Sequence, residues 1–88
     1  MQSSEAQSFM ERMSRETGVK LATGLNAFTQ YADIGDYEHV EIMIDPTGFS
    51  ESEECFITSY AEDKGLRVEA LWNDWGRYIK LSDHRRPY

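Results

Sequence analysis

The chain has 88 residues, of which 40% are hydrophobic and 12% aromatic, and its formal net charge is -7. This length fits one domain spanning 1–88, and the aromatic content is too high for a disordered segment. The negative charge disfavours direct binding to nucleic acid or anionic membranes, because like charges repel at long range. The sequence shows neither a signal-peptide pattern nor roughly 20 consecutive apolar residues, so we expect a cytoplasmic protein.

The first predicted element is a helix over residues 3–17. Ser3 or Ser4 is expected to cap its start, and Gly18 suits its C-terminal end. Residues 19–34 are ambiguous, because their apolar residues fit both a helical and an alternating spacing. We favour extended structure for this segment, followed by a turn at its DIGD sequence.

Residues 38–45 alternate apolar and polar side chains, which predicts a strand with one buried face formed by Val40, Ile42 and Ile44. After a DPTG turn, Ser50 and Glu53 have the spacing of a capping box, in which each side chain bonds the other residue's amide. The helix that follows is expected to end near Lys64. Its predicted apolar stripe consists of Phe56, Ile57, Tyr60 and Ala61.

The last elements predict a hairpin, with a strand over residues 66–72, a turn at NDWG and a return strand over residues 77–81. Glu69 and Lys80 are expected to pair across it if the register allows. The inward side chains are predicted to be Leu66, Val68, Ala70 and Trp72. The chain is therefore expected to be α+β, in the order α-β-β-α-β-β. Three to four strands form a small antiparallel sheet, and both helices pack on one face of it.

No motif in the sequence predicts catalysis. Cys55 is the one thiol, and the acidic residues around it disfavour a second anion there, so we expect a buried or unreactive cysteine. The acidic turns do not fit the spacing of a calcium loop, and the glycines do not form a phosphate-binding loop. We therefore expect a non-enzymatic protein without a cofactor or a bound metal.

The most unusual feature is a stretch of 43 residues, 21–63, that contains ten carboxylates and neither Lys nor Arg. Surfaces that serve only solubility usually mix both signs, because like charges cost stability. A field of one sign is suited to steering a protein toward a basic partner. The acidic residues predicted to contact such a partner are Asp33, Asp36, Glu38, Glu41, Asp45, Glu51, Glu54 and Glu62.

The hairpin tip is a second candidate contact site. Trp75 lies in the turn, where a large indole is usually exposed, and Arg77 and Tyr78 follow it. Exposed Trp, Arg and Tyr residues are typical of binding hot spots. The alternative is that the Trp75 indole folds back over Trp72 or Tyr78 and stabilises the hairpin.

These patterns favour an interaction protein whose acidic face binds, and inhibits, a basic partner that normally binds nucleic acid. In size and charge the chain is similar to small acidic inhibitors of phages and mobile elements, including DNA-mimic antirestriction and anti-CRISPR proteins. That similarity is one of composition, and no motif carries it. The alternative is an adaptor or assembly subunit that binds a protein partner through the Trp75 hairpin tip or a sheet edge.

Overall fold

The computed structural model describes residues 1–22, 24–31, 40–74 and 76–83. Within these residues, two helices and four strands follow one another in the predicted order α-β-β-α-β-β. Their bounds are α1 Ser3–Thr17, β1 Ala27–Tyr31, β2 Val40–Ile44, α2 Glu51–Asp63, β3 Leu66–Asn73 and β4 Gly76–Asp83. The structure thus confirms the α+β class predicted from the sequence.

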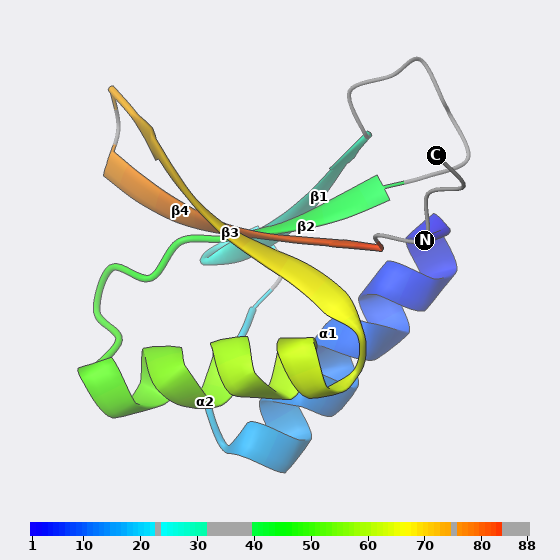
Figure 1. Cartoon of the computed structure of the whole chain (residues 1–88), viewed down its shortest axis with the longest axis horizontal. Coiled ribbons are helices and arrows are strands. Elements are labelled where there is room, and N and C mark those ends of the chain that lie inside the picture. Colours follow the sequence, from blue (N-terminus) through cyan, green and yellow to red (C-terminus); the bar gives the residue numbers. More distant parts are fainter. Residues whose placement is uncertain (23, 32–39, 75, 84–88) are drawn as a thin grey trace.

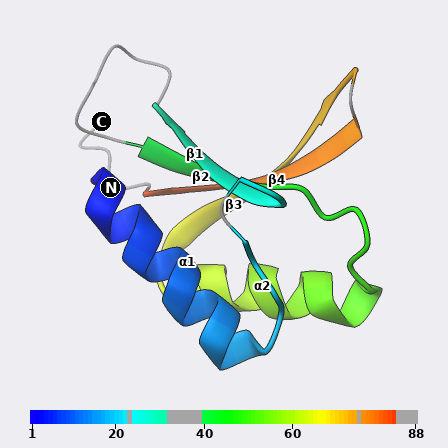
Figure 2. The ribbon, with the colours of Figure 1, turned by 180° about the vertical axis from the view of Figure 1, so that it is seen from behind.

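The strands form one antiparallel sheet in the order β1-β2-β4-β3, and both helices lie on the same side of it (Figure 1, Figure 2). α1 lies toward the β1 edge and α2 toward the β3 edge. We call the covered side of the sheet the helix face and the other side the open face. On the central strands, Ile42 pairs with Leu81 and Ile44 with Ile79, and all four side chains are buried on the helix face.

The hydrophobic core fills the space between the helix face and the two helices. Its largest fully buried side chains are Met13, Val19, Ile42, Ile44, Ile57, Ile79 and Leu81. Burial of each large apolar side chain contributes about 1.5–3 kcal/mol relative to exposure. The core therefore draws on both helices and on the two central strands, which fixes where α2 sits on the sheet.

The start of α1 differs from the prediction. Its N-cap is Gln2 rather than Ser3 or Ser4, and the Gln2 amide donates to Glu5 Oε1 at 3.2 Å. The sequence offers several polar residues in a row here, and propensity alone does not choose among them. The other end is as predicted, because Gly18 adopts a φ of 76° and its amide donates to the carbonyl oxygen of Ser14.

Among the described residues of the ambiguous segment, the expected strand is present as β1. The residues before it form a turn in which the Gly24 amide donates to the carbonyl oxygen of Ala27 at 2.8 Å. The helical spacing therefore does not correspond to a helix in residues 19–22 and 24–31, which the structure describes. The turn predicted at the DIGD sequence lies outside the described residues.

The predicted capping box of α2 is present. Ser50 Oγ accepts from the Glu53 amide at 3.1 Å, and the Ser50 amide donates to Glu53 Oε1 at 2.9 Å. Ile57 is fully buried, as predicted for the apolar stripe, but Phe56 is 55% exposed. One residue rotates a helix by about 100°, so the turn that directs Ile57 into the core directs its neighbour to solvent.

The prediction that β2 has one buried face is incomplete. Met43 lies on the open face but is only 6% exposed. It sits opposite Phe28 in β1 and opposite Lys80 in β4, so neighbouring side chains flank it on both sides. Alternation in a single strand shows which side a residue faces, but it does not show which neighbours cover it.

The hairpin has the predicted register, with Glu69 opposite Lys80, but the prediction for Trp72 was wrong. Leu66 and Val68 pack against the core, whereas Trp72 shares their side of the strand and is 76% exposed. The indole points to the helix side of the sheet at a place that neither helix covers. Trp75 itself lies outside the described residues.

Candidate interaction surface

The acidic stretch does not form a single continuous face. Glu41 lies on the open face, whereas Glu51, Glu54 and Glu62 lie on α2, on the opposite side of the sheet. Asp45 follows directly after β2. The three remaining predicted contact residues, Asp33, Asp36 and Glu38, lie outside the described residues. We therefore asked which described carboxylates are already neutralised within the chain.

Glu54 is neutralised by Arg77. The Arg77 guanidinium donates to both carboxylate oxygens of Glu54, at 2.5 and 2.6 Å, which joins α2 to β4 across the hairpin. The hydrogen bonds from Arg77 lower the pKa of Glu54, and the same bonds raise the pKa of Arg77. Two residues predicted to contact a partner are thus engaged with each other. This pair positions the first turns of α2 under the hairpin.

Glu41 is neutralised by Lys80 in a chain of polar contacts across the open face. Lys80 Nζ lies 3.3 Å from Glu41 Oε2 and 3.5 Å from Glu69 Oε1, and Arg67 Nε lies 3.5 Å from Glu69 Oε1. Gln30 on β1 also donates to Glu41, at 3.5 Å. The Lys80 side chain is only 18% exposed. These contacts connect all four strands. Glu41 and Lys80, whose side chains are 12% and 18% exposed, therefore stabilise the sheet and are poorly placed to bind a partner, whereas Arg67 at the β3 edge is half exposed.

Two further carboxylates bond the backbone. Asp45 Oδ1 accepts from the Thr47 amide at 3.0 Å, and hydrogen bonds from Thr47 lower the pKa of Asp45. Glu53 closes the capping box of α2, as described above. Both groups satisfy amides in the turn between β2 and α2, which is a structural use of acidic side chains.

Within the described part of the acidic stretch, the carboxylates that form no ion pair or backbone hydrogen bond lie on one side of α2. We define the α2 outer face as its seven exposed residues, Glu51, Ser52, Cys55, Phe56, Ser59, Glu62 and Asp63. Successive members are one or three residues apart, so they lie on one side of the helix, away from the buried Ile57 and Ala61. This face carries three acidic residues and no base, and none of the three has an ion pair within the described part of the chain.

The cation nearest α2 in the sequence, Lys64, lies against the Tyr60 side of the helix. Lys64, at the C-terminal end of the helix, places its Nζ 5.4 Å from the centre of the Tyr60 ring. The Tyr60 hydroxyl donates to Glu16 of α1 at 2.9 Å; burial, and then this bond, raise the pKa of Tyr60. The Tyr60 side of α2 therefore holds the two helices together. The α2 outer face remains negative.

The hairpin residues do not form one cluster. Arg77 points to the helix face, whereas Tyr78 lies on the open face with its ring 6.1 Å from that of Phe28, in an edge-to-face arrangement. Trp72 is the exposed aromatic residue that the structure describes on the hairpin. Sequence reasoning missed both Trp72 and Phe56 as contact candidates, because each was assigned to the core. It also omitted Asp63, although the helical spacing from Glu62 and Ser59 places it on the same side.

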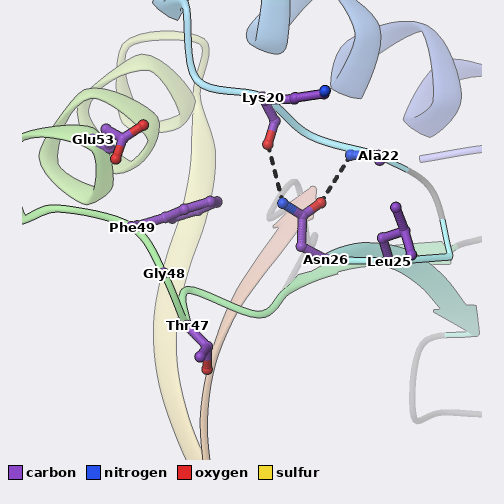
Figure 3. Close-up of a pocket in the computed structure, with 8 residues that line it drawn as sticks. All are labelled: Lys20, Ala22, Leu25, Asn26, Thr47, Gly48, Phe49 and Glu53. Carbon is purple, nitrogen blue, oxygen red and sulfur yellow. Dashed lines mark hydrogen bonds between the residues drawn. The ribbon is translucent and has the colours of Figure 1, made fainter.

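A shallow pocket of about 410 Å³ lies between the segment before β1 and the turn that leads into α2 (Figure 3). Asn26 lies in its wall, where its side chain accepts from the Ala22 amide at 2.8 Å and donates to the carbonyl oxygen of Lys20 at 3.0 Å. The Asn26 side-chain amide is thus already used to hold the backbone of residues 20–22 in place. The residues around it are Lys20, Ala22, Leu25, Asn26, Thr47, Gly48, Phe49 and Glu53.

The described residues contain no group of three or more His, Cys, Asp or Glu side chains that could hold a metal ion. Cys55 is exposed on α2, with its Sγ 3.9 Å from Ser59 Oγ. Of the two alternatives expected for Cys55, buried or unreactive, the structure excludes the first, and its low reactivity stays a prediction. In the part of the chain that is described, neither helix has the length and apolar character needed to cross a membrane. Comparison with protein families, curated proteins and solved structures finds no match to this chain.

Proposed function

We propose that the chain is a non-enzymatic interaction protein that binds a basic partner through the α2 outer face. The observation that carries this proposal is the division of the acidic residues. Glu41 and Glu54 are each paired with a cation from β4, whereas Glu51, Glu62 and Asp63 are exposed and form no ion pair with any described residue. Among the described residues of the acidic stretch, the charge without an ion pair thus lies on α2, where a basic surface can relieve its repulsion.

The layout of this face fits contact with several basic side chains. From Glu51 to Asp63 the helix rises about 18 Å, at roughly 1.5 Å per residue. Phe56 lies on the same face and is 55% exposed, so it provides an apolar anchor between the terminal charges. A rigid helix with fixed caps also loses little conformational freedom when it binds.

We further propose that the partner is a nucleic-acid-binding protein and that binding inhibits it. Proteins that bind nucleic acid carry clusters of Lys and Arg that neutralise phosphates. Carboxylates spaced along a helix compete for the same cations, so occupation of such a cluster excludes the nucleic acid. The small size and net charge of -7 are consistent with this role.

The test is capture of partners from a nuclease-treated lysate of the source cells, at low and high salt. Glu51→Gln with Glu62→Gln removes two charges from the α2 outer face. The matched control, Glu11→Gln with Asp74→Asn, removes two exposed charges elsewhere and gives the same net charge. We expect a nucleic-acid-binding protein that is captured at low salt and lost at high salt. The α2 variant should lose it, and the control should retain it. Equal capture by both variants would refute the proposal.

The exposed Trp72 favours a second candidate function, an adaptor that binds through the hairpin. Here the partner would be retained at high salt, because an apolar anchor rather than charge would hold it. Trp72→Ala would then abolish capture, and the α2 variant would leave it unchanged. The same set of variants therefore distinguishes the two functions.

A further inference from the structure

We propose that two copies of this chain pair edge to edge through β3, forming a continuous eight-stranded antiparallel sheet. β3 is the outermost strand in the order β1-β2-β4-β3, and no described element lies beyond it. It is eight residues long, whereas β1 at the other edge has five. A long edge strand presents a row of unpaired amides and carbonyls, which is a template for another strand.

The register shows which backbone groups of β3 face outward. Asn73 pairs with Gly76 across a two-residue turn, so this is a hydrogen-bonded pair, and such pairs alternate along the ladder. In an antiparallel sheet, successive residues of a strand direct their backbone groups to opposite neighbouring strands. Applied from β3 through β4 to β2, this rule predicts that the backbone groups of Asp45 point toward β1. The Asp45 amide does donate to the carbonyl oxygen of Asn26, which directly precedes β1. The residues whose backbone amides and carbonyls point away from β4 are therefore Leu66, Val68, Ala70 and Trp72.

Charge selects one register for the pairing of two β3 strands. With the two-fold axis at Val68, Arg67 lies directly opposite the partner's Glu69, and Glu69 lies opposite the partner's Arg67. An axis at Glu69 would oppose two glutamates, an axis at Arg67 would oppose two arginines, and an axis at Ala70 would leave both charges without an opposite partner. Opposite charges across an antiparallel pair stabilise it, and like charges destabilise it. Arg67 is half exposed and lies on the open face with Glu69, so both can reach across.

The helix side of the strand also fits this register. Ala70 is exposed and small, and it would lie opposite the partner's Leu66, which already packs against its own core. The exposed Trp72 would extend toward the end of the partner's α2 and gain cover there. The two α2 helices lie toward their β3 edges, so they would come side by side on one face of the joined sheet (Figure 1). The proposed acidic surface would then be doubled.

The edge is tested with Ala70→Pro. The Ala70 amide faces outward, so proline removes a donor from the edge and leaves the ladder to β4 intact. In sedimentation velocity from micromolar to sub-millimolar concentration, the unaltered chain should form a dimer, and the variant should bind itself at least tenfold more weakly. Far-UV circular dichroism checks that the variant is folded. If the unaltered chain stays monomeric over this whole concentration range, or if the folded variant dimerises equally well, the proposal is overturned.

The register is tested with two charge variants, which also serve if the proline variant fails to fold. Arg67→Glu gives a strand with two acidic residues at these positions, and Glu69→Arg gives one with two basic residues. Each variant alone should be monomeric, because like charges would then oppose each other. A mixture of the two should form a mixed dimer, since every opposed pair then has opposite charges. Two variants that each dimerise alone, or a mixture that stays monomeric, would contradict the assigned register.

Discussion

The exposure of Trp72 gives the sharpest prediction about stability. Trp72→Ala removes the largest side chain of β3. If this tryptophan were buried, its truncation to alanine would cost about 3–5 kcal/mol of unfolding free energy. In this structure the residue is 76% exposed, so only about a quarter of its surface is covered, on the order of 60 Å². At roughly 25 cal/mol per Å², this cover is worth at most about 1.5 kcal/mol, and a compact unfolded state reduces the figure further.

Urea titration followed by far-UV circular dichroism measures this loss, because that signal does not depend on the indole removed. The control is Leu81→Ala, which truncates a fully buried side chain in β4 and should cost about 2–5 kcal/mol. The titration should be run at low micromolar concentration, where the proposed dimer contributes little. A loss above about 3 kcal/mol for Trp72→Ala would refute the reasoning, since it would mean that the indole is buried.

Three further predictions follow from the contacts of single residues. Glu54→Gln removes the ion pair with Arg77; the folded-state pKa of Glu54 is lowered, so its contribution is present above about pH 4.5 and lost as the pH falls. The unaltered chain should therefore lose more unfolding free energy than the variant between neutral and acid pH, as measured by urea titration; parallel losses would contradict the pair. Lys80→Met removes the cation that contacts both Glu41 and Glu69 and should cost about 1–3 kcal/mol at neutral pH; an unchanged urea midpoint would contradict these contacts. Cys55 is exposed, so a thiol reagent should label one thiol per native chain without unfolding; labelling only in denaturant would show that the thiol is covered.

Local patterns predicted most of the fold. The capping box at Ser50 and Glu53, the glycine after α1 and the alternation in β2 are set by neighbours in the sequence, so they can be recognised without tertiary information. The opposition of Glu69 and Lys80 followed from the turn between the two strands. These features require only the geometry of a single element or of one hairpin.

The errors have a common physical cause, which is that burial depends on what lies opposite a residue. Trp72 and Val68 share one side of β3, but only Val68 packs against the core. Met43 lies on the side expected to be exposed, and side chains from neighbouring strands cover it. The same limit applies to the candidate site, because Glu54 and Arg77, which pair with each other, are 23 residues apart in the sequence. From composition alone, paired and free carboxylates look alike.

The most direct test of the account is the affinity of a captured basic partner for the chain and for two matched variants. Isothermal titration at low salt would compare the unaltered chain with Glu51→Gln/Glu62→Gln and with Glu11→Gln/Asp74→Asn, all of which stay folded in our account. We predict that the first variant binds at least tenfold more weakly and that the second binds within about twofold of the unaltered chain, because only the α2 outer face meets the partner. Equal weakening by both variants would show that net charge alone drives binding, and it would contradict the assignment of the α2 outer face.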